Sequence, residues 1–405
     1  MEKNKKRSYL DYAASAPVDT RVGKVMRKAE KTFANPNSLH SFGMEARKIL
    51  ESARADIASA LGLRPDDAFG EIIFTGSATE ANNLALRGVL SSAAKKTRIP
   101  AKPKIIISKV EHDSVYETAK DIKREGLADV AFIPVNKNGV VDVPRLAKEL
   151  DSRTVLVSVM YVNNEVGTVE PVKEISKIIS DFRKTQTDKL FPVFHTDAVQ
   201  AFQYFDCNVG SLGVDLLTLS AHKLCGPKGV GALFARGGGL ADNERPIKSV
   251  TTGGEQEFGL RGGTQNVQGI AGFAEAVRIA SASRAKEFAR VLRIRRLMIK
   301  EIKKLCPRAE VNGDKSGKFS SPHVLNVWFP GITSDFLLMK LDMESVAASS
   351  GSACRAHAPT PPRTVTEMFG IERAKESVRF SMGKYTTHED VKILVKVLKR
   401  TIGRA

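Results

Sequence analysis

The sequence predicts an α/β protein with a mostly parallel seven-stranded sheet and a smaller C-terminal α/β domain. Two patterns lead to this fold class. Short apolar runs rich in β-branched residues alternate with helical or turn segments, and such runs are typical of parallel strands covered on both faces. A long helical pattern and a sparser set of strands follow. The seven strands expected in the main sheet are 71–75, 104–108, 130–135, 154–162, 191–197, 215–222 and 230–235.

The part of the chain after the main sheet has a different pattern. The Gly- and Thr-rich stretch 251–266 predicts a structured loop, and the apolar spacing beyond it predicts a long helix over 268–305. The Pro-rich segment 358–364 is typical of an exposed loop. Because shorter strands are interspersed here, we expect a second α/β domain that closes on the first. These strands are 324–329, 345–350 and 377–382.

The composition is that of a globular protein rather than a disordered one. The chain has 405 residues, of which 42% are hydrophobic and 27% charged. No apolar run is long enough for a transmembrane helix, and the charged start has no apolar stretch behind it, so we expect a cytoplasmic protein without a membrane partner. No two of the four cysteines have a CxxC spacing, which predicts neither a metal site nor a disulfide. They are Cys207, Cys225, Cys306 and Cys354.

The net charge of +18 indicates an anionic ligand or an acidic partner as possibilities. The excess gathers in 284–308 and 384–404, where apolar residues also recur at helical spacing. Two amphipathic helices with solvated basic faces are the simplest interpretation. Direct nucleic-acid binding is disfavoured, because aromatic residues are only 6% of the chain and do not interleave with the basic ones.

Three loops at predicted strand ends carry residues for cofactor chemistry. Ligands of open parallel sheets bind beyond the carboxyl ends of the strands. There, Lys223 in SAHKLCGPKG is a candidate Schiff-base lysine, although a single lysine is most often a surface residue. Asp197 can keep a pyridinium nitrogen protonated, and GSATEANN at 76–83 offers hydroxyls and a helix N-terminus for a phosphate. Together the three loops predict a pyridoxal 5'-phosphate site.

Further motifs carry a family resemblance. They are VEHDSV at 110–115, MYVNNEVGTVEP at 160–171, RGGT at 261–264 and SSGSAC at 349–354. With the three loops, they resemble the cysteine desulfurases of the IscS/NifS branch (group I), within the class V aminotransferase superfamily of pyridoxal-phosphate fold type I. The resemblance runs from residue 9 to residue 387. We accordingly expect a large domain over 20–265, and a small domain formed by 1–19 and 266–405.

The resemblance implies a role for each matching residue. Lys223 would bind the cofactor covalently, Asp197 would pair with its pyridinium nitrogen, and Gln200 would hydrogen-bond its ring hydroxyl. His112 would stack on the ring and assist proton transfers. The phosphate ligands would be Ala78, Thr79, Ser220 and His222, with Thr264 contributed by the neighbouring subunit of a homodimer. Asn164 and Arg379 would receive the substrate carboxylate.

Cys354 is the expected nucleophile. The resemblance implies that it takes sulfur from L-cysteine as a persulfide and that L-alanine is released. The persulfide would pass to an acceptor protein, an iron–sulfur scaffold or a tRNA-thiolation enzyme. Arg355 and His357 stand where many relatives have small or hydroxyl residues. These charges are expected to favour the thiolate or to dock an acceptor. The other three cysteines are expected to be buried and inert.

Two alternatives remain open at the level of sequence. The same cofactor could serve an enzyme acting on selenocysteine or cysteine sulfinate, although SSGSAC favours sulfur from cysteine. A basic binding protein could also retain the fold without catalysis. The intact set of Lys223, Asp197, His112 and Cys354 argues against that second alternative.

Overall fold

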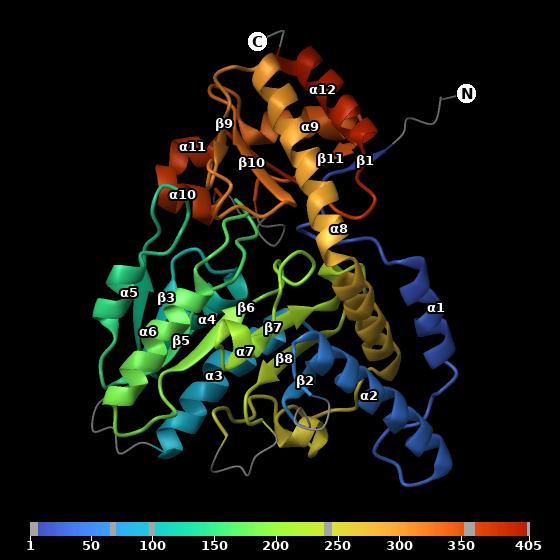
Figure 1. Ribbon diagram of the computed structural model, residues 1–405, viewed down its shortest axis with the longest axis vertical. Coiled ribbons are helices and arrows are strands. Elements are labelled where there is room, and N and C mark those ends of the chain that lie inside the picture. Colours follow the sequence, from blue (N-terminus) through green and yellow to red (C-terminus); the bar gives the residue numbers. More distant parts are fainter. Residues whose placement is uncertain (1–6, 65–69, 97–101, 239–244, 352–360, 403–405) are drawn as a thin grey trace.

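The computed structural model describes residues 7–64, 70–96, 102–238, 245–351 and 361–402. Its larger part is built on a seven-stranded sheet with the order β2-β8-β7-β6-β5-β3-β4 (Figure 1). Only β8 runs antiparallel to its neighbours, and all other pairs are parallel. This confirms the predicted fold class. The strands are β2 (Ile72–Thr75), β3 (Lys104–Ser108), β4 (Asp129–Ile133), β5 (Thr154–Ser158), β6 (Val193–Asp197), β7 (Leu216–Ser220) and β8 (Gly231–Ala235).

Helices cover both faces of this sheet because successive strand residues point to opposite sides. Ile72 and Phe74 of β2 belong to one apolar cluster, whereas Ile73 belongs to the other. Helices α3 and α4 line the second face, and the remaining long helices line the first. The helices of this part are α1 (Thr20–Ala29), α2 (Ser41–Ala60), α3 (Ala78–Lys96), α4 (Asp113–Arg124), α5 (Val143–Glu149), α6 (Val172–Thr185) and α7 (Val209–Leu212).

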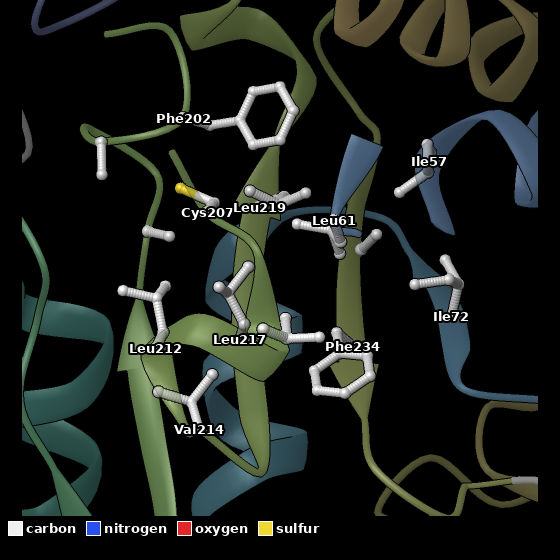
Figure 2. Packing of buried hydrophobic residues seen from close by; sticks show 14 of the residues in the cluster. Ile57, Leu61, Ile72, Phe202, Cys207, Leu212, Val214, Leu217, Leu219 and Phe234 are labelled. Carbon is white, nitrogen blue, oxygen red and sulfur yellow. The ribbon is translucent and has the colours of Figure 1, made fainter. Parts of the chain in front are cut away.

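Figure 2 shows part of the first cluster, where residues distant in sequence meet. Leu217 and Leu219 of β7 pack near Phe234 of β8 and near Leu61, which follows α2. Cys207 lies in the same apolar packing and is fully buried. Burial raises the pKa of its thiol to about 12, which agrees with the inert role predicted for Cys207.

The smaller part of the molecule has its own sheets and its own core. A three-stranded sheet has the order β12-β10-β9, and β1 pairs with β11. The strand β9 was not expected from the sequence, because it is only three residues long. The elements of this part are β1 (Ser8–Tyr9), β9 (Glu310–Asn312), β10 (Val324–Trp328), α9 (Ser334–Met343), β11 (Val346–Ala347), α10 (Arg363–Phe369), α11 (Ile371–Lys375), β12 (Ser377–Ser381) and α12 (His388–Ile402).

The long helix α8 (Val267–Leu305) belongs to both parts (Figure 1). Ile270, Phe273 and Val277 lie in the core of the large sheet, whereas Val291 and Met298 lie in the core of the small one. The predicted domain division between residues 265 and 266 stays a proposal. The two cores favour placing it within α8 instead.

Several local expectations need correction. Strand β5 ends at Ser158 and β7 at Ser220, earlier than predicted, because the chain turns there toward the loops described below. Residues 251–266 contain a short 3-10 turn, η2 (Gln256–Gly259), within the predicted loop. In the Pro-rich segment, Pro362 is buried and Arg363 begins α10, so this end is not an exposed loop. Residues 358–360 lie outside the described residues.

Both basic stretches form amphipathic helices, as predicted. In α8, Ile294 and Met298 are buried while Arg293 and Lys300 are exposed, and α12 alternates in the same way. None of the helices among the described residues combines the length and apolar character needed to cross a membrane.

A buried ion pair fixes the loop that follows the large sheet. Arg54 of α2 donates to both carboxylate oxygens of Glu257, at 2.9 and 3.0 Å, and also to the carbonyl of Ile72. Glu257 has a positive φ of 48° and also accepts from the amide of Phe74 at 2.8 Å. Both charges are removed from bulk water, so each depends on the other.

Arg54→Met should therefore lower the free energy of unfolding by about 3–5 kcal/mol, because it leaves Glu257 as an uncompensated buried charge. Urea denaturation measures the loss. Arg87→Met, which breaks an ion pair with Glu125 at the surface, is the matched control and should cost far less. Equal losses in the two variants would show that Glu257 does not depend on Arg54 for its burial.

Two further buried carboxyl groups, those of Glu170 and Glu111, form no ion pair within the part of the chain that the structure describes. The side chain of Glu170 accepts a hydrogen bond from the amide of Val141 at 2.9 Å, and its other oxygen has no partner among the described residues. Burial and, to a smaller extent, the nearby carboxyl of Glu111 raise the pKa of Glu170 to about 8. The pKa of Glu111 is likewise raised to about 8.

Since the pKa of Glu170 is higher in the folded than in the unfolded chain, its contribution to stability is present below about pH 4.5 and is lost as the pH rises through about 8. Glu170→Gln should remove this loss and stabilise the protein at about pH 9 more than at about pH 4. Urea midpoints at both pH values test it. The same change at the exposed Glu174 should leave the pH profile as it was.

Candidate active site at the carboxyl edge of the large sheet

A cavity of about 330 Å³ lies at the carboxyl ends of β6 and β7. It is closed on one side by the N-terminal segment at Ala13–Ser15 and on another by β12 of the small sheet. Most of the predicted site residues line it, although they come from six separate places in the chain. They are Ala78, Thr79, His112, Asn164, Asp197, Gln200, Ser220, His222, Lys223 and Arg379.

The other two predicted site residues are Thr264 and Cys354. Thr264 is exposed and does not line the cavity of its own chain. Cys354, with Arg355 and His357, lies outside the described residues.

Lys223 reaches the cavity from a 3-10 turn, η1 (Ala221–Lys223), directly after β7. The turn requires glycine at 226, because a Cβ there would lie 2.7 Å from the carbonyl oxygen of Ala221. Lys223 Nζ donates to the carbonyl oxygens of Ala13 and Ala14, both at 2.6 Å. The amine is thus held at the cavity by backbone acceptors that a reacting group can replace.

Asp197 ends β6 and presents a buried carboxylate to the same cavity. One oxygen accepts from the amide of Val199 at 3.0 Å, and the other accepts from Asn82 Nδ2 at 2.9 Å. Asn82, on α3, is fully buried. Its contact restricts the carboxylate to one orientation.

Asn82 also reaches the second candidate residue, His112. Its amide nitrogen donates to Ser114 Oγ at 2.8 Å, and that hydroxyl lies 2.8 Å from His112 Nδ1. Ser114 can therefore donate its own proton to Nδ1, which also accepts from the Ser114 amide as the N-cap of α4. In a neutral ring the proton is then on Nε2. Sequence reasoning did not single out Asn82 or Ser114, although both lie within recognised motifs.

The N-terminus of α3 forms the opposite wall. Backbone amides at a helix N-terminus attract anions, and Ala78 and Thr79 stand there at the cavity. Strand β8 passes so close that a Cβ on Gly231 would lie 2.6 Å from the carbonyl carbon of Ser77. Glu80 accepts from the amide of Gly76 at 2.6 Å and pairs with Arg261 at 2.7 Å. The loop before α3 is therefore held by the packing of β8 and by the contacts of Glu80.

His222 and Ser220 face this helix end across the cavity. Burial, together with the positive groups of Lys223 and Lys228, lowers the pKa of His222 to about 4. The imidazole is neutral near pH 7. It therefore offers a hydrogen bond rather than a charge to an anion bound there.

Arg379 of β12 is the most deeply buried charged residue of the site, with 1% of its surface exposed. It donates to the carbonyl of Asn164 at 3.0 Å and to Asp11 at 2.7 Å. Its Nε is buried without a partner among the described residues. An unsatisfied guanidinium donor beside the cavity suits a carboxylate ligand.

The remaining described cysteines differ from each other. Cys225 is buried beside the cavity, and burial raises the pKa of its thiol to about 11, which agrees with an inert role. Cys306, which was expected to be buried, is only partly so, because it ends α8 at the surface of the small part.

The arrangement fits pyridoxal phosphate. An amine, a buried carboxylate and a helix N-terminus stand around one cavity, and strand β8 can pass close to that helix end because residue 231 is glycine. These are the groups that would hold the aldehyde carbon, the ring nitrogen and the phosphate of that cofactor.

Comparisons with known proteins agree with this chemistry. A family model described as aminotransferase class-V matches residues 8–394. Cysteine desulfurase IscS of Dictyoglomus turgidum is 39% identical over 402 residues, which cover 99% of this chain and 95% of that protein. Cysteine desulfurase IscS of Escherichia coli is 36% identical over 405 residues, with 98% and 93% covered.

Solved structures show the same relationship. A NifS-like protein superposes with a TM-score of 0.86 at 33% identity, covering 99% of this chain and 100% of that one. DndA from Streptomyces lividans superposes with a TM-score of 0.73 at 31% identity, with 93% and 99% covered. The chain therefore belongs to the class-V aminotransferase family and is a pyridoxal-phosphate-dependent cysteine desulfurase.

Proposed function

We propose that the cavity converts L-cysteine to L-alanine and that the sulfur passes to Cys354 as a persulfide. The observation that carries the proposal is the meeting of Lys223, Asp197 and the N-terminus of α3 around one cavity. A solved structure described as SspA in complex with cysteine is 30% identical to this chain, with a TM-score of 0.74. That relative supports cysteine as the substrate here.

The cofactor would be held at three points. Lys223 Nζ would hold it covalently, and the Asp197 carboxylate would hold the ring nitrogen in its protonated form. The phosphate would lie at the start of α3, with Ser220 and His222 opposite. His112 would stack on the ring, and Gln200 would contact the ring hydroxyl.

Pyridoxal phosphate, when bound, supplies an electron sink for the bonds broken at the substrate. Lys223, once displaced by the substrate amine, is placed to take the proton from the α-carbon. Arg379 and Asn164 would hold the substrate carboxylate, and Arg379 has a donor, Nε, with no partner among the described residues. His112, with its proton on Nε2, would serve the later proton transfers.

The sulfur transfer uses Cys354. Its thiolate would attack the substrate sulfur, so that an S–S bond forms and the substrate Cβ–S bond breaks. The electron pair of the broken bond stays with the carbon fragment, which gains protons and leaves as alanine. The described chain leads up to this residue from beside the cavity, because Ser349 exchanges backbone hydrogen bonds with Arg379 at 2.6 and 3.1 Å.

The persulfide would be passed to an acceptor protein of iron–sulfur cluster assembly or of tRNA thiolation. The cytoplasm, where thiols stay reduced, would suit both uses. The charged residues Arg355 and His357, next to the nucleophile in sequence, would tune its ionisation or contact that acceptor.

We further propose a homodimer in which Thr264 completes the phosphate site of the partner. Thr264 is exposed, and the loop that carries it is fixed at Arg261 by the ion pair with Glu80. A residue held in place yet absent from its own cavity is suited to a role in another subunit.

Borohydride reduction of the purified yellow protein should attach the cofactor to Lys223, and peptide mass spectrometry would locate it. Lys223→Ala should abolish alanine production, because both the covalent attachment and the base are lost. Cys354→Ala should still bind cofactor and cysteine but should accumulate no persulfide. Label on another lysine, or persulfide in the Cys354→Ala protein, would end the proposal.

Thr264→Ala should weaken cofactor retention by about tenfold, the effect of losing one hydrogen bond to a charged group, with the fold unchanged. Dialysis against a cofactor-free buffer measures the retention, and circular dichroism checks the fold. Sedimentation should show a dimer at assay concentration. An active monomer that retains its cofactor would refute the shared site.

A further inference from the structure

The side-chain amide of Gln200 is fixed by contacts at both of its ends. Its nitrogen, Nε2, donates to the carbonyl oxygen of Ala13 at 2.9 Å. A backbone carbonyl can only accept, so the nitrogen has to be on that side. Its oxygen, Oε1, then faces His323 Nε2 at 3.1 Å. An oxygen there requires a donor, so His323 carries its proton on Nε2.

The position of that proton also decides the contact on the other side of the histidine ring. With the proton on Nε2, Nδ1 is an acceptor, and Ser321 Oγ lies 3.0 Å from it. The ring stacks on Tyr204 with 4.5 Å between centroids and 20° between planes. Ser321 therefore donates to His323, His323 donates to Gln200, and Gln200 donates to the carbonyl of Ala13. In this chain of three hydrogen bonds, each side chain accepts from the one before it and donates to the next.

His323 is neutral, so this direction is stable. Burial, together with the positive groups of Arg379, Arg295 and Lys223, lowers the pKa of His323 to about 3. Only 4% of the residue is exposed. A neutral imidazole has a single N–H, and that N–H is used on Gln200.

His323 also joins the two parts of the molecule. It precedes β10 of the small sheet, whereas Gln200 follows β6 of the large one. The amide of Gln200 has one more N–H, and the residue lines the cavity. Oε1 is directed toward His323, so the second N–H of Nε2 is the group that this amide presents to a ligand in the cavity.

We propose that His323 is a positioning residue, which holds the Gln200 amide so that it presents a donor and not an acceptor to the cofactor. The inference rests on the proposed function, in which Gln200 contacts the ring hydroxyl. A donor there favours the anionic form of the ring oxygen and strengthens cofactor binding. Without His323 only the carbonyl of Ala13 would restrain the amide, so the N–H would be presented to the cofactor less firmly.

The test compares His323→Met with His323→Gln. Methionine fills a similar volume without a donor, whereas glutamine brings an Nε2 to the position of the imidazole nitrogen. Two properties are measured on protein reconstituted with pyridoxal phosphate: the dissociation constant and the pH at which its absorption band shifts. His323→Met should weaken binding about tenfold and raise that pH by about one unit, the size of one hydrogen bond. His323→Gln should restore both toward the wild-type values.

Two further variants separate the possible causes. Tyr204→Phe keeps the stacked ring and should change neither property. Ser321→Ala removes only the donor to Nδ1, is mild enough to keep the fold, and should weaken binding about threefold in the same direction. If His323→Met does not fold, Ser321→Ala decides the matter, and an unchanged dissociation constant and band would refute the inference.

Gln200→Leu shows whether a negative result refutes only the role of His323 or also the proposed role of Gln200 as a cofactor ligand. If Gln200→Leu leaves binding and absorption unchanged, Gln200 is no cofactor ligand, and the proposed site is wrong. If Gln200→Leu alters both and His323→Met alters neither, only the role of His323 is refuted. Equal losses in His323→Met and His323→Gln would mean that the ring serves packing alone, which also refutes it.

Discussion

The buried guanidinium of Arg379 is the contact on which the rest of the site depends. A cation with 1% of its surface exposed needs acceptors around it, and these come from Asp11 of the N-terminal segment and from the carbonyl of Asn164. One side chain thereby joins three segments that are far apart in sequence. The N-terminal segment it holds is the same one whose carbonyls accept from Lys223 and Gln200.

Polar groups behind the cavity also organise it from the large sheet outward. Asn82 orients the carboxylate of Asp197 and, through Ser114, the ring of His112. Helix α3 therefore has two roles, since its N-terminus attracts the anion and its first turns orient two reacting side chains. An amide is suited to this position because its two N–H groups can serve two acceptors at once.

The features that could be predicted from the sequence are those that depend on neighbouring residues in the chain. The strands of the large sheet are continuous apolar runs. Asp197 ends one strand and Lys223 lies shortly after another, so their meeting at one edge of the sheet could be expected. The contacts of Asn82, Asp11 and His323 could not, because they depend on which segments pack together. Pro362 shows the opposite error, where local composition suggested an exposed loop but packing buries the residue.

Helix α8 has a consequence for how the enzyme can tolerate change. With 39 residues it is about 58 Å long, and it supplies apolar side chains to both cores. Each core fixes the rotation of its own half. One residue inserted between Ala280 and Val291 would rotate one half by about 100° relative to the other. Insertions and deletions in this stretch should therefore be tolerated far less than substitutions. They would turn the apolar side chains of one half of α8 away from the core into which they pack.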